Sequence, residues 1–214
     1  MEALVFGASG ALGSAIVDEL QQRHYRVHTH GHDQSIDMLD AMPSLDAVVW
    51  AQGINGADSI ADGFADGIYA AVMEANVTFV ARSMAHLLRI GRINNPGRLC
   101  VLSSIWQDQA RTNKLSYTVS KAAVGGLVRS CAADLGKRGI LINAVLPGVV
   151  DTPMTRKNLS SEQIERIQGA SALGHLATPQ DIATTVAFLI GPENLSITAQ
   201  SLTVDAGFSL VREL

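Results

Sequence analysis

The sequence has few of the features that mark secreted, membrane-spanning or nucleic-acid-binding proteins. Its 214 residues include only two cysteines, Cys100 and Cys131, which lie in separate apolar runs and form no C-x-x-C pair. We therefore expect both to be reduced core thiols of a cytoplasmic protein. The net charge of −4 excludes a strongly basic surface for nucleic acid or an anionic membrane. No apolar run approaches the length of about 20 residues that crosses a bilayer.

Charged residues are also scarce, at 17%, whereas apolar residues make up 47% of the chain. This balance excludes a disordered chain and predicts a well-buried globular one. The length suits one hydrophobic core, so we expect a single domain over residues 1–214. The first residues, MEALVFGASG, carry an acidic side chain and pass directly into a glycine loop, which is not the pattern of a signal peptide.

Short apolar runs typical of strands alternate with helical patterns along the whole chain. The candidate strands are EALVF, YRVHTH, DAVVWA, RLCVLSS, ILINAVLP and QSLTVDA, and the candidate helices are residues 11–23, 68–90, 117–136 and 179–190. Near-continuous apolar strands that alternate with helices predict a parallel sheet covered on both faces. The expected fold class is therefore α/β, a doubly wound parallel sheet of the Rossmann type.

One part of this fold is shortened, namely the region between the second and fourth strands. Residues 25–51 would normally hold two strands, a crossover helix and a third strand, and a crossover helix alone needs ten or more residues. We expect the segment DMLDAMPSL to form a single turn at most. The sheet should therefore be trimmed at this edge.

Three glycines, Gly7, Gly10 and Gly13, follow the first strand and open the first helix. Glycines at this turn let the backbone approach a pyrophosphate, and the free N–H groups of the helix N-terminus bind its oxygens. A G-x-x-G-x-x-G pattern alone is weak, but here it has the strand-to-helix setting that the motif needs. The turn predicts nucleotide binding, against the alternative of a flexible connection.

The end of the second strand, HTHGHD, bears on the choice of nucleotide. An acidic residue there would repel the 2′-phosphate of NADP, but Gly31 holds that position, and His32 could face the phosphate. NADP(H) is therefore favoured over NAD(H), although Asp33 lies one residue further on. His28, His30 and His32 alternate as metal ligands can. We expect a polar strand end beside the cofactor instead, and no metal.

Tyr117 and Lys121 lie four residues apart in an otherwise apolar helical stretch, LSYTVSKAAVGGLVRS, and so share one helix face. An ammonium near a phenol favours the phenolate and is expected to lower the pKa of the tyrosine. Such a pair can transfer protons near neutral pH. By itself the spacing is more typical of an ordinary amphipathic helix with a rim tyrosine and a snorkelling lysine, because such pairs arise by chance in many helices.

With these motifs in place, the sequence resembles the short-chain dehydrogenases/reductases over nearly its full length, and among them the 3-oxoacyl-reductase-like carbonyl reductases. GASGALG resembles their nucleotide loop, and ANVTFVARSMAHLL resembles their helix with an active-site asparagine, here Asn76. The segment from GRLCVLSS to VLPGVVDTPM is similar to the family core, with Ser104 at the expected distance before Tyr117. The carboxyl-terminal LATPQDIATTVAFLIGPENLSITAQSLTVDAGF resembles the closing signature of the family.

The resemblance implies a role for each matching residue. Tyr117 would be the proton donor or acceptor, Ser104 would bind the substrate oxygen, and Lys121 would hold the nicotinamide ribose. Asn76 would position a water molecule for a proton relay. Asp37 and Met38 are implied near the adenine. The predicted cofactor-binding residues are Gly7, Ser9, Gly10, Leu12, Gly13, His32, Asp37, Met38, Ala51, Gly53, Tyr117, Lys121, Val150 and Thr152.

Two departures from the family pattern concern the cofactor site. The usual Asn-Ala-Gly after the fourth strand is replaced by WAQG, which introduces the bulkier Gln52, and Ala11 takes the place of the middle glycine. On the substrate side, residues 153–176 resemble a short mobile lid over the active site. They carry no cluster of basic residues, and a short lid suits small or open-ended carbonyl substrates.

Three functions fit the sequence. The leading hypothesis is an NAD(P)-dependent oxidoreductase that acts on a small carbonyl or secondary alcohol, with no nucleic-acid or membrane partner. An epimerase or dehydratase with tightly bound NAD is the second, although such enzymes usually have a further substrate domain. A non-catalytic NAD(P)-sensing protein is the third. The apolar circumference of the helices at 68–90 and 117–136 and the resemblance both predict a homodimer or homotetramer, unless those side chains are simply buried in the core.

Overall fold

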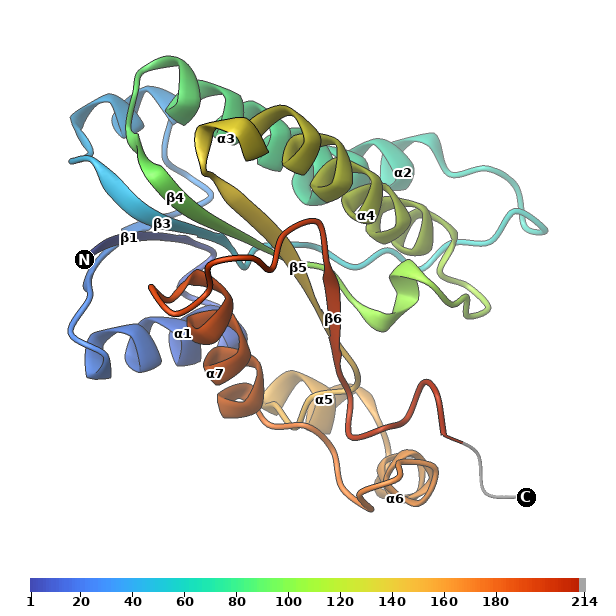
Figure 1. Cartoon of the computed structure of the whole chain (residues 1–214). Helices are drawn as coiled ribbons and strands as arrows, with labels where there is room; N and C mark the ends of the chain where they lie inside the picture. Colours follow the sequence, from blue (N-terminus) through green and yellow to red (C-terminus); the bar gives the residue numbers. More distant parts are fainter. Residues whose placement is uncertain (212–214) are drawn as a thin grey trace.

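The computed structural model describes residues 1–211, and its strands form one parallel sheet of six strands in the order β2-β1-β3-β4-β5-β6 (Figure 1). The four inner strands are buried along most of their length, as expected for a parallel sheet that is covered on both faces, whereas the edge strands β2 and β6 are partly exposed. The strands are β1 (Glu2–Phe6), β2 (Arg26–His30), β3 (Leu45–Trp50), β4 (Ile93–Leu102), β5 (Leu141–Pro147) and β6 (Ser201–Val204). The predicted α/β class and doubly wound sheet are confirmed.

Helices cover both faces of the sheet, with α2, α3 and α4 on one side and α1 and α7 on the other (Figure 1). Two buried apolar clusters result, one between the sheet and each helical layer. The α-helices are α1 (Ala11–Gln22), α2 (Asp66–Met73), α3 (Phe79–Arg89), α4 (Leu115–Leu135), α5 (Pro153–Asn158), α6 (Ser161–Gly169) and α7 (Pro179–Ile190). None of the helices within residues 1–211 is long and apolar enough to cross a bilayer.

The shortened edge is present where the sequence places it. After β2 the chain forms only the 3-10 helix η1 (Ile36–Ala41) before it enters β3, so β2 remains the edge strand. The Ser35 hydroxyl caps η1 by accepting a hydrogen bond from the Asp37 N–H, and Leu39 buries its side chain completely in the core. These two anchors extend η1 beyond the single turn that we expected.

The helical pattern at 68–90 is broken into three pieces. A π-helical turn, η2 (Glu74–Thr78), separates α2 from α3 and contains Asn76. The apolar periodicity continues through the turn, so the pattern predicts one helix where the structure has a bulge. Single π-turns of this kind are frequent at functional sites.

The apolar residues of α3 and α4 pack into the hydrophobic core. Val124 and Val128 are 0% exposed and Met84 is 2% exposed, and Phe79 and Leu127 pack partly buried against the same cluster. Burial therefore explains the apolar circumference that we interpreted as a subunit interface, and the oligomeric state stays a prediction.

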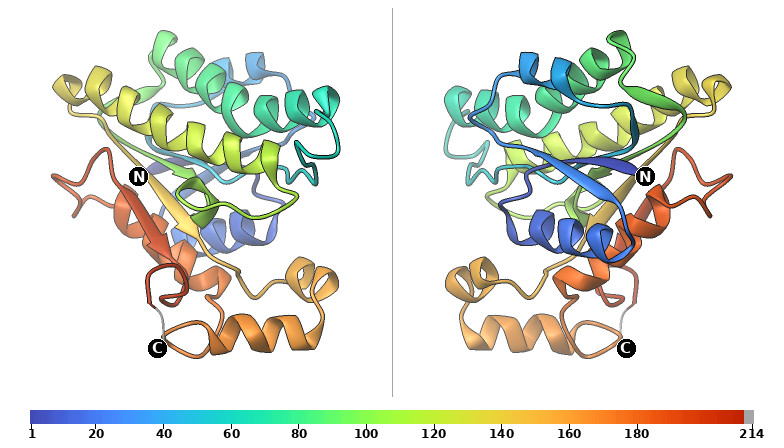
Figure 2. Two further views of the ribbon diagram at one scale, coloured as in Figure 1. Left: turned by 90° about the vertical axis from the view of Figure 1, so that its right-hand side faces the viewer. Right: turned by 90° about the vertical axis from the view of Figure 1, so that its left-hand side faces the viewer.

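The segment predicted as a lid forms α5 and α6, which lie apart from the two helical layers (Figure 2). Thr152 is the N-cap of α5, and its hydroxyl accepts a hydrogen bond from the Thr155 N–H. Met154 on α5 is 71% exposed. The lid function and the domain limits stay predictions, and residues 212–214 of the predicted domain lie outside the described residues.

Candidate active site

The glycine turn is held by close backbone contacts. Gly7 has a φ of +75°, and a Cβ atom there would lie 2.6 Å from the backbone nitrogen of Gln52. A Cβ on Gly13 would lie only 2.1 Å from the Gly7 carbonyl oxygen. Gly10 begins helix α1 without a side-chain cap, so the first N–H groups of α1 have no side chain in front of them. The backbone geometry therefore suits an anion, such as a pyrophosphate, at this turn.

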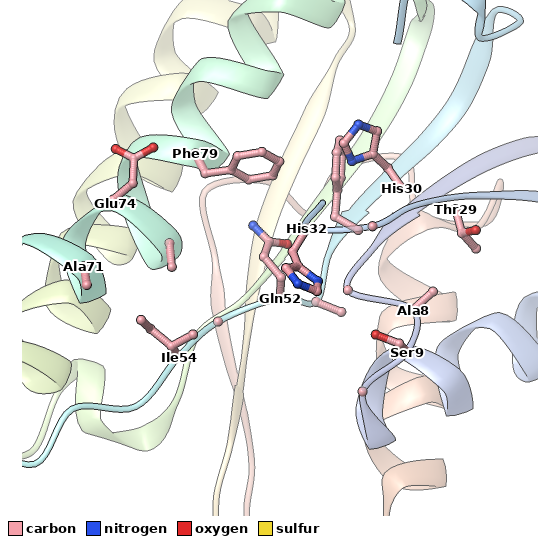
Figure 3. Close-up of a pocket in the computed structure, with 17 residues that line it drawn as sticks. Ala8, Ser9, Thr29, His30, His32, Gln52, Ile54, Ala71, Glu74 and Phe79 are labelled. Atoms are coloured by element: carbon pink, nitrogen blue, oxygen red, sulfur yellow. The ribbon is translucent and has the colours of Figure 1, made fainter. Parts of the chain in front are cut away.

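A cavity of about 780 Å³ opens beside the glycine turn (Figure 3). Its walls come from the turn, the end of β2, the loop after β3, and the helical stretch from α2 to the start of α3. Figure 3 shows Gln52 and Ile54 between the glycine turn on one side and Glu74 and Phe79 on the other. The elements that bring these residues together are the carboxyl ends of neighbouring parallel strands, where ligands of such folds bind.

The cavity separates the predicted cofactor-binding residues into two groups. Those that line it are Gly7, Ser9, Gly10, His32, Ala51 and Gly53. Those that do not line it are Leu12, Gly13, Asp37, Met38, Tyr117, Lys121, Val150 and Thr152. Asp37 and Met38 lie on η1, where Met38 is 51% exposed. Because Asp37 and Met38 do not line the cavity, the cavity does not support their predicted position beside the adenine. Gly13 packs against the Gly7 carbonyl and supports the turn from behind.

Two observations show that this wall fits a dinucleotide. The glycine turn leaves no room for side chains at Gly7 and Gly13, as close approach of a diphosphate requires. The side-chain amide of Gln52 and the Nδ1 atom of His30 are buried in the cavity wall and have no hydrogen-bond partner within residues 1–211. Unpaired buried polar atoms are rare in native proteins and indicate a missing partner.

The histidines of the second strand have separate partners. His28 Nε2 lies 2.6 Å from Glu2 Oε2, and His30 Nε2 lies 3.1 Å from the Ser35 carbonyl oxygen. His32 lines the cavity. The part of the chain that the structure describes contains no group of three or more histidine, cysteine or acidic side chains able to hold a metal ion.

The predicted catalytic side chains converge behind the cavity. Ser104 follows β4 and is buried, and a hydrogen bond joins its side chain to Tyr117 on α4. One turn further along α4, the Lys121 ammonium lies 5.5 Å from the centroid of the Tyr117 ring. Lys121 Nζ donates a hydrogen bond to the Leu102 carbonyl oxygen at 3.0 Å. The strand end and the helix thus place a hydroxyl, a phenol and an ammonium together.

The structure corrects the expected pKa of the tyrosine. Burial raises the pKa of Tyr117 above its ordinary value, and the hydrogen bond with Ser104 lowers it in part. Burial also lowers the pKa of Lys121 to about 8. The prediction that Lys121 lowers the pKa of Tyr117 is therefore wrong for this structure, because the low dielectric of the site disfavours both charged forms.

Asn76 connects this group with the cavity wall. Its Oδ1 accepts a hydrogen bond from the Ile54 N–H at 2.8 Å, and its Nδ2 donates to the Ile54 carbonyl oxygen at 2.9 Å and to Ser120 Oγ at 3.0 Å. A Cβ on Gly53 would lie 3.1 Å from Asn76 Oδ1 and 3.5 Å from Lys121 Nζ. Gly53 lines the cavity, so the missing side chain at this position leaves Lys121 next to the cofactor cavity.

Asp58 is a residue of the site region that the sequence analysis missed. Its carboxylate is buried and accepts hydrogen bonds from the backbone N–H and the hydroxyl of Ser116, directly before Tyr117. Lys114 Nζ also donates to Asn55 Oδ1 at 2.9 Å, in the same loop. The loop after β3 therefore supplies the cap of α4. Since the two partners are far apart in the sequence, no local pattern indicates this cap.

The described geometry combines a parallel-sheet nucleotide cavity with a serine, a tyrosine and a lysine, which defines a nucleotide-dependent oxidoreductase. Comparison with known proteins agrees. The profile described as enoyl-(acyl carrier protein) reductase matches residues 12–209. The chain belongs to the short-chain dehydrogenase/reductase family.

Individual relatives match the chain nearly end to end. An uncharacterized oxidoreductase of Bacillus subtilis, YmfI, is 29% identical over 96% of this chain and 98% of the relative. The 3-oxoacyl-[acyl-carrier-protein] reductase FabG of Vibrio cholerae is 28% identical over 98% of this chain and 97% of the relative. A solved variant of actinorhodin polyketide ketoreductase with NADPH is 27% identical, with a TM-score of 0.87 over 98% of this chain and 97% of that one.

The glycine turn gives a first prediction. Gly13→Ala should destabilise the fold by more than about 3 kcal/mol and abolish nucleotide binding, because its Cβ would overlap the Gly7 carbonyl. Gly10→Ala is the matched control, since a Cβ there meets that same oxygen at an ordinary 3.5 Å. Gly10→Ala should lower the free energy of unfolding by no more than about 1 kcal/mol. Urea denaturation of both variants checks this, and equal losses of stability would contradict the account of the turn.

The cap of α4 gives a second prediction. Asp58→Ala removes a buried acceptor from Ser116 and should lower the free energy of unfolding by about 2 kcal/mol. Asp62→Ala, on the exposed part of the same loop, should change it by less than about 0.5 kcal/mol. Thermal and urea denaturation of both variants measure the difference. A loss for Asp58→Ala as small as that for Asp62→Ala would show that the cap is unimportant.

The buried lysine gives a third prediction. Because the native pKa of Lys121 is about 8 and that of an unfolded lysine is about 10.4, the unfolded state binds more protons between these values. The lysine therefore destabilises the fold below pH 8, and this penalty fades as the pH rises. The stability of the wild type minus that of Lys121→Met should grow by up to about 1.4 kcal/mol per pH unit above pH 8. A difference that stays constant from pH 7 to 9.5 would refute the lowered pKa.

Proposed function

We propose that this chain interconverts a small carbonyl compound and its alcohol, with Tyr117 as the proton donor in reduction. As a member of its family, the chain is an NAD(P)-dependent oxidoreductase that acts on CH–OH or C=O groups. The observation that carries the proposal is the position of Gly53, which lines the cofactor cavity and lies against Lys121 and Asn76. This contact puts the proton-transfer groups next to the cavity.

The side chains have separate tasks in the proposed reaction. Tyr117 is protonated at neutral pH because its pKa is raised, so it can give its phenolic proton to a carbonyl oxygen. The Ser104 hydroxyl donates a hydrogen bond to the same oxygen and stabilises the negative charge that develops there. When bound, the nicotinamide supplies the hydride. Lys121 holds the ribose and returns a proton to Tyr117, and Asn76 fixes the loop at Ile54 beside it.

The proton donor is tested by Tyr117→Phe, which removes only the hydroxyl. Turnover should fall by about 10² to 10⁴-fold, the usual contribution of a general acid, while NADPH affinity stays within about threefold. Tyr69→Phe, on α2, is the matched control and should keep full activity. Reduction of a panel of ketones, with loss of NADPH absorbance, measures turnover, and fluorescence titration measures binding. Turnover that survives in Tyr117→Phe would overturn the assignment of the donor.

We also propose that the chain prefers NADP(H) to NAD(H). His32 lines the cavity at the end of β2, and Gly31 itself contributes no carboxylate that would repel a 2′-phosphate. The carboxylate nearest to this position is that of Asp33, whose Oδ1 would lie 2.6 Å from a Cβ at residue 31. The Gly31 N–H is bound to Gln34 Oε1 at 2.7 Å, which holds the turn after β2 in place. The similar polyketide ketoreductase was solved with NADPH.

The preference is tested at Gly31. Gly31→Asp should weaken NADPH binding at least tenfold and leave NADH binding nearly unchanged, because its carboxylate would face the 2′-phosphate. The atoms nearest to a Cβ at this position belong to the movable side chains of Asp33 and Gln34, so the fold should tolerate the change. Gly67→Asp is the control, since it adds the same charge on α2 with nothing within 4 Å. An unchanged ratio of the two affinities in Gly31→Asp would contradict the proposed preference.

The substrate class and the assembly are further parts of the proposal. Names of relatives, such as 3-oxoacyl-[acyl-carrier-protein] reductase, support a panel that includes 3-oxoacyl thioesters beside simple ketones. A homodimer or homotetramer is supported by the edge position of β6, where Leu202 is 39% exposed, and light scattering measures it. The two free cysteines support a reducing compartment such as the cytoplasm.

A further inference from the structure

Two cations in the segment that joins Ser104 to Tyr117 have no task in the proposed reaction. They are Arg111 and Lys114. Lys114 directly precedes α4, so it lies about one helical turn from Tyr117, at the amino-terminal end of the helix. Its side chain is partly exposed, and Arg111 is exposed. Both positive charges are therefore near the proton donor and open to a ligand from solvent.

The Lys114 ammonium lies against the loop after β3. Its Nζ donates to Asn55 Oδ1 at 2.9 Å and to the Gly56 carbonyl oxygen at 3.0 Å. An ammonium has three N–H groups, and the third finds no acceptor within residues 1–211. The same loop begins at Gly53, which lines the cofactor cavity and lies next to Lys121. Lys114 therefore lies where the loop of the cofactor cavity meets the catalytic helix, with one donor to spare.

The charges around Lys114 leave an excess of positive charge. Burial lowers the pKa of Lys114, the charge of Arg111 lowers it further, and the charge of Asp58 raises it. The Asp58 carboxylate is already bound by the backbone N–H and the hydroxyl of Ser116. Within residues 1–211, Lys114 and Arg111 form no salt bridge, and the guanidinium of Arg111 has no hydrogen bond. An anion between the two cations would relieve their repulsion.

We propose that Arg111 and Lys114 bind the carboxylate of an oxo acid whose carbonyl group reaches Tyr117. The inference rests on the proposed function and narrows its substrate class from carbonyl compounds in general to oxo acids. The guanidinium can pair with both carboxylate oxygens, and the spare N–H of Lys114 can donate to one of them. Because both cations lie close to Tyr117 along the chain, the carboxylate and the carbonyl are only a few bonds apart. A thioester of the same acid has no charge at this position.

Three pairs of substrates test the proposal on the wild type. The probes are 2-oxopentanoate, 3-oxopentanoate and 4-oxopentanoate, and each is compared with its own methyl ester, which lacks the charge. At least one acid should have a kcat/KM at least tenfold above that of its ester, mainly through a lower KM, because charge-assisted hydrogen bonds hold it. Added sodium chloride should reduce this advantage. Esters that are reduced as efficiently as all three acids would overturn the proposal.

Variants assign the preference to the two charges. Arg111→Gln and Lys114→Met should each reduce the preference for the acid to about threefold or less, whereas Arg111→Lys keeps the charge and should keep most of the preference. Arg129→Gln is the matched control, because Arg129 is exposed on the same helix about 18 Å beyond Tyr117. It should keep the wild-type preference. A full preference for the acid in folded Arg111→Gln and Lys114→Met would overturn the assignment.

A binding measurement separates this inference from the proposed function. Calorimetric titration of the wild type with NADP⁺ present compares the affinity for each acid with that for its ester, without turnover. If ketones and esters are reduced but no acid is preferred in binding or turnover, only the anion site is wrong. If nothing is reduced but an acid binds at least tenfold more tightly than its ester, only the function is wrong. If no probe is reduced or bound, both are wrong. Thermal melting shows whether each variant is folded.

Discussion

The structure depends on the way in which the loop after β3 is fixed between the glycine turn and the catalytic helix. Gly7 packs against the backbone of Gln52, Asn76 binds both backbone groups of Ile54, and Asp58 caps α4 at Ser116. One short stretch of chain therefore forms part of the cofactor cavity and also holds the start of the helix that carries Tyr117 and Lys121. Replacing any of these anchors should disturb both parts together.

Burial governs the electrostatics of the site. Tyr117 and Lys121 lie close enough to interact, but the low dielectric raises the pKa of the phenol and lowers that of the ammonium. Both shifts favour the neutral forms, so the phenol holds its proton at neutral pH. This suits a proton donor for carbonyl reduction. A substrate oxygen that becomes negative would draw the proton from Tyr117, and the hydrogen bond with Ser104 already orients the two hydroxyls.

Much of this arrangement could be predicted from the sequence, and the exceptions have physical reasons. The sequence predicts the strands to within a few residues, except at the start of β4, because strands that are buried on both faces stand out as apolar runs along the chain. The sequence does not predict the π-turn at Asn76, because this turn is stabilised by contacts with Ile54 and Ser120 that no local pattern reveals. The same holds for the Asp58 cap. Gln52 was noticed only as a departure, because its lack of a partner depends on the burial of its amide.

Amide hydrogen exchange with and without NADPH tests most directly the claim that one loop joins the cofactor cavity to the catalytic helix. We expect NADPH to slow exchange at residues 51–56 and, at the same time, at residues 115–117 at the start of α4. Slower exchange at the glycine turn alone, with the loop and α4 unchanged, would contradict it.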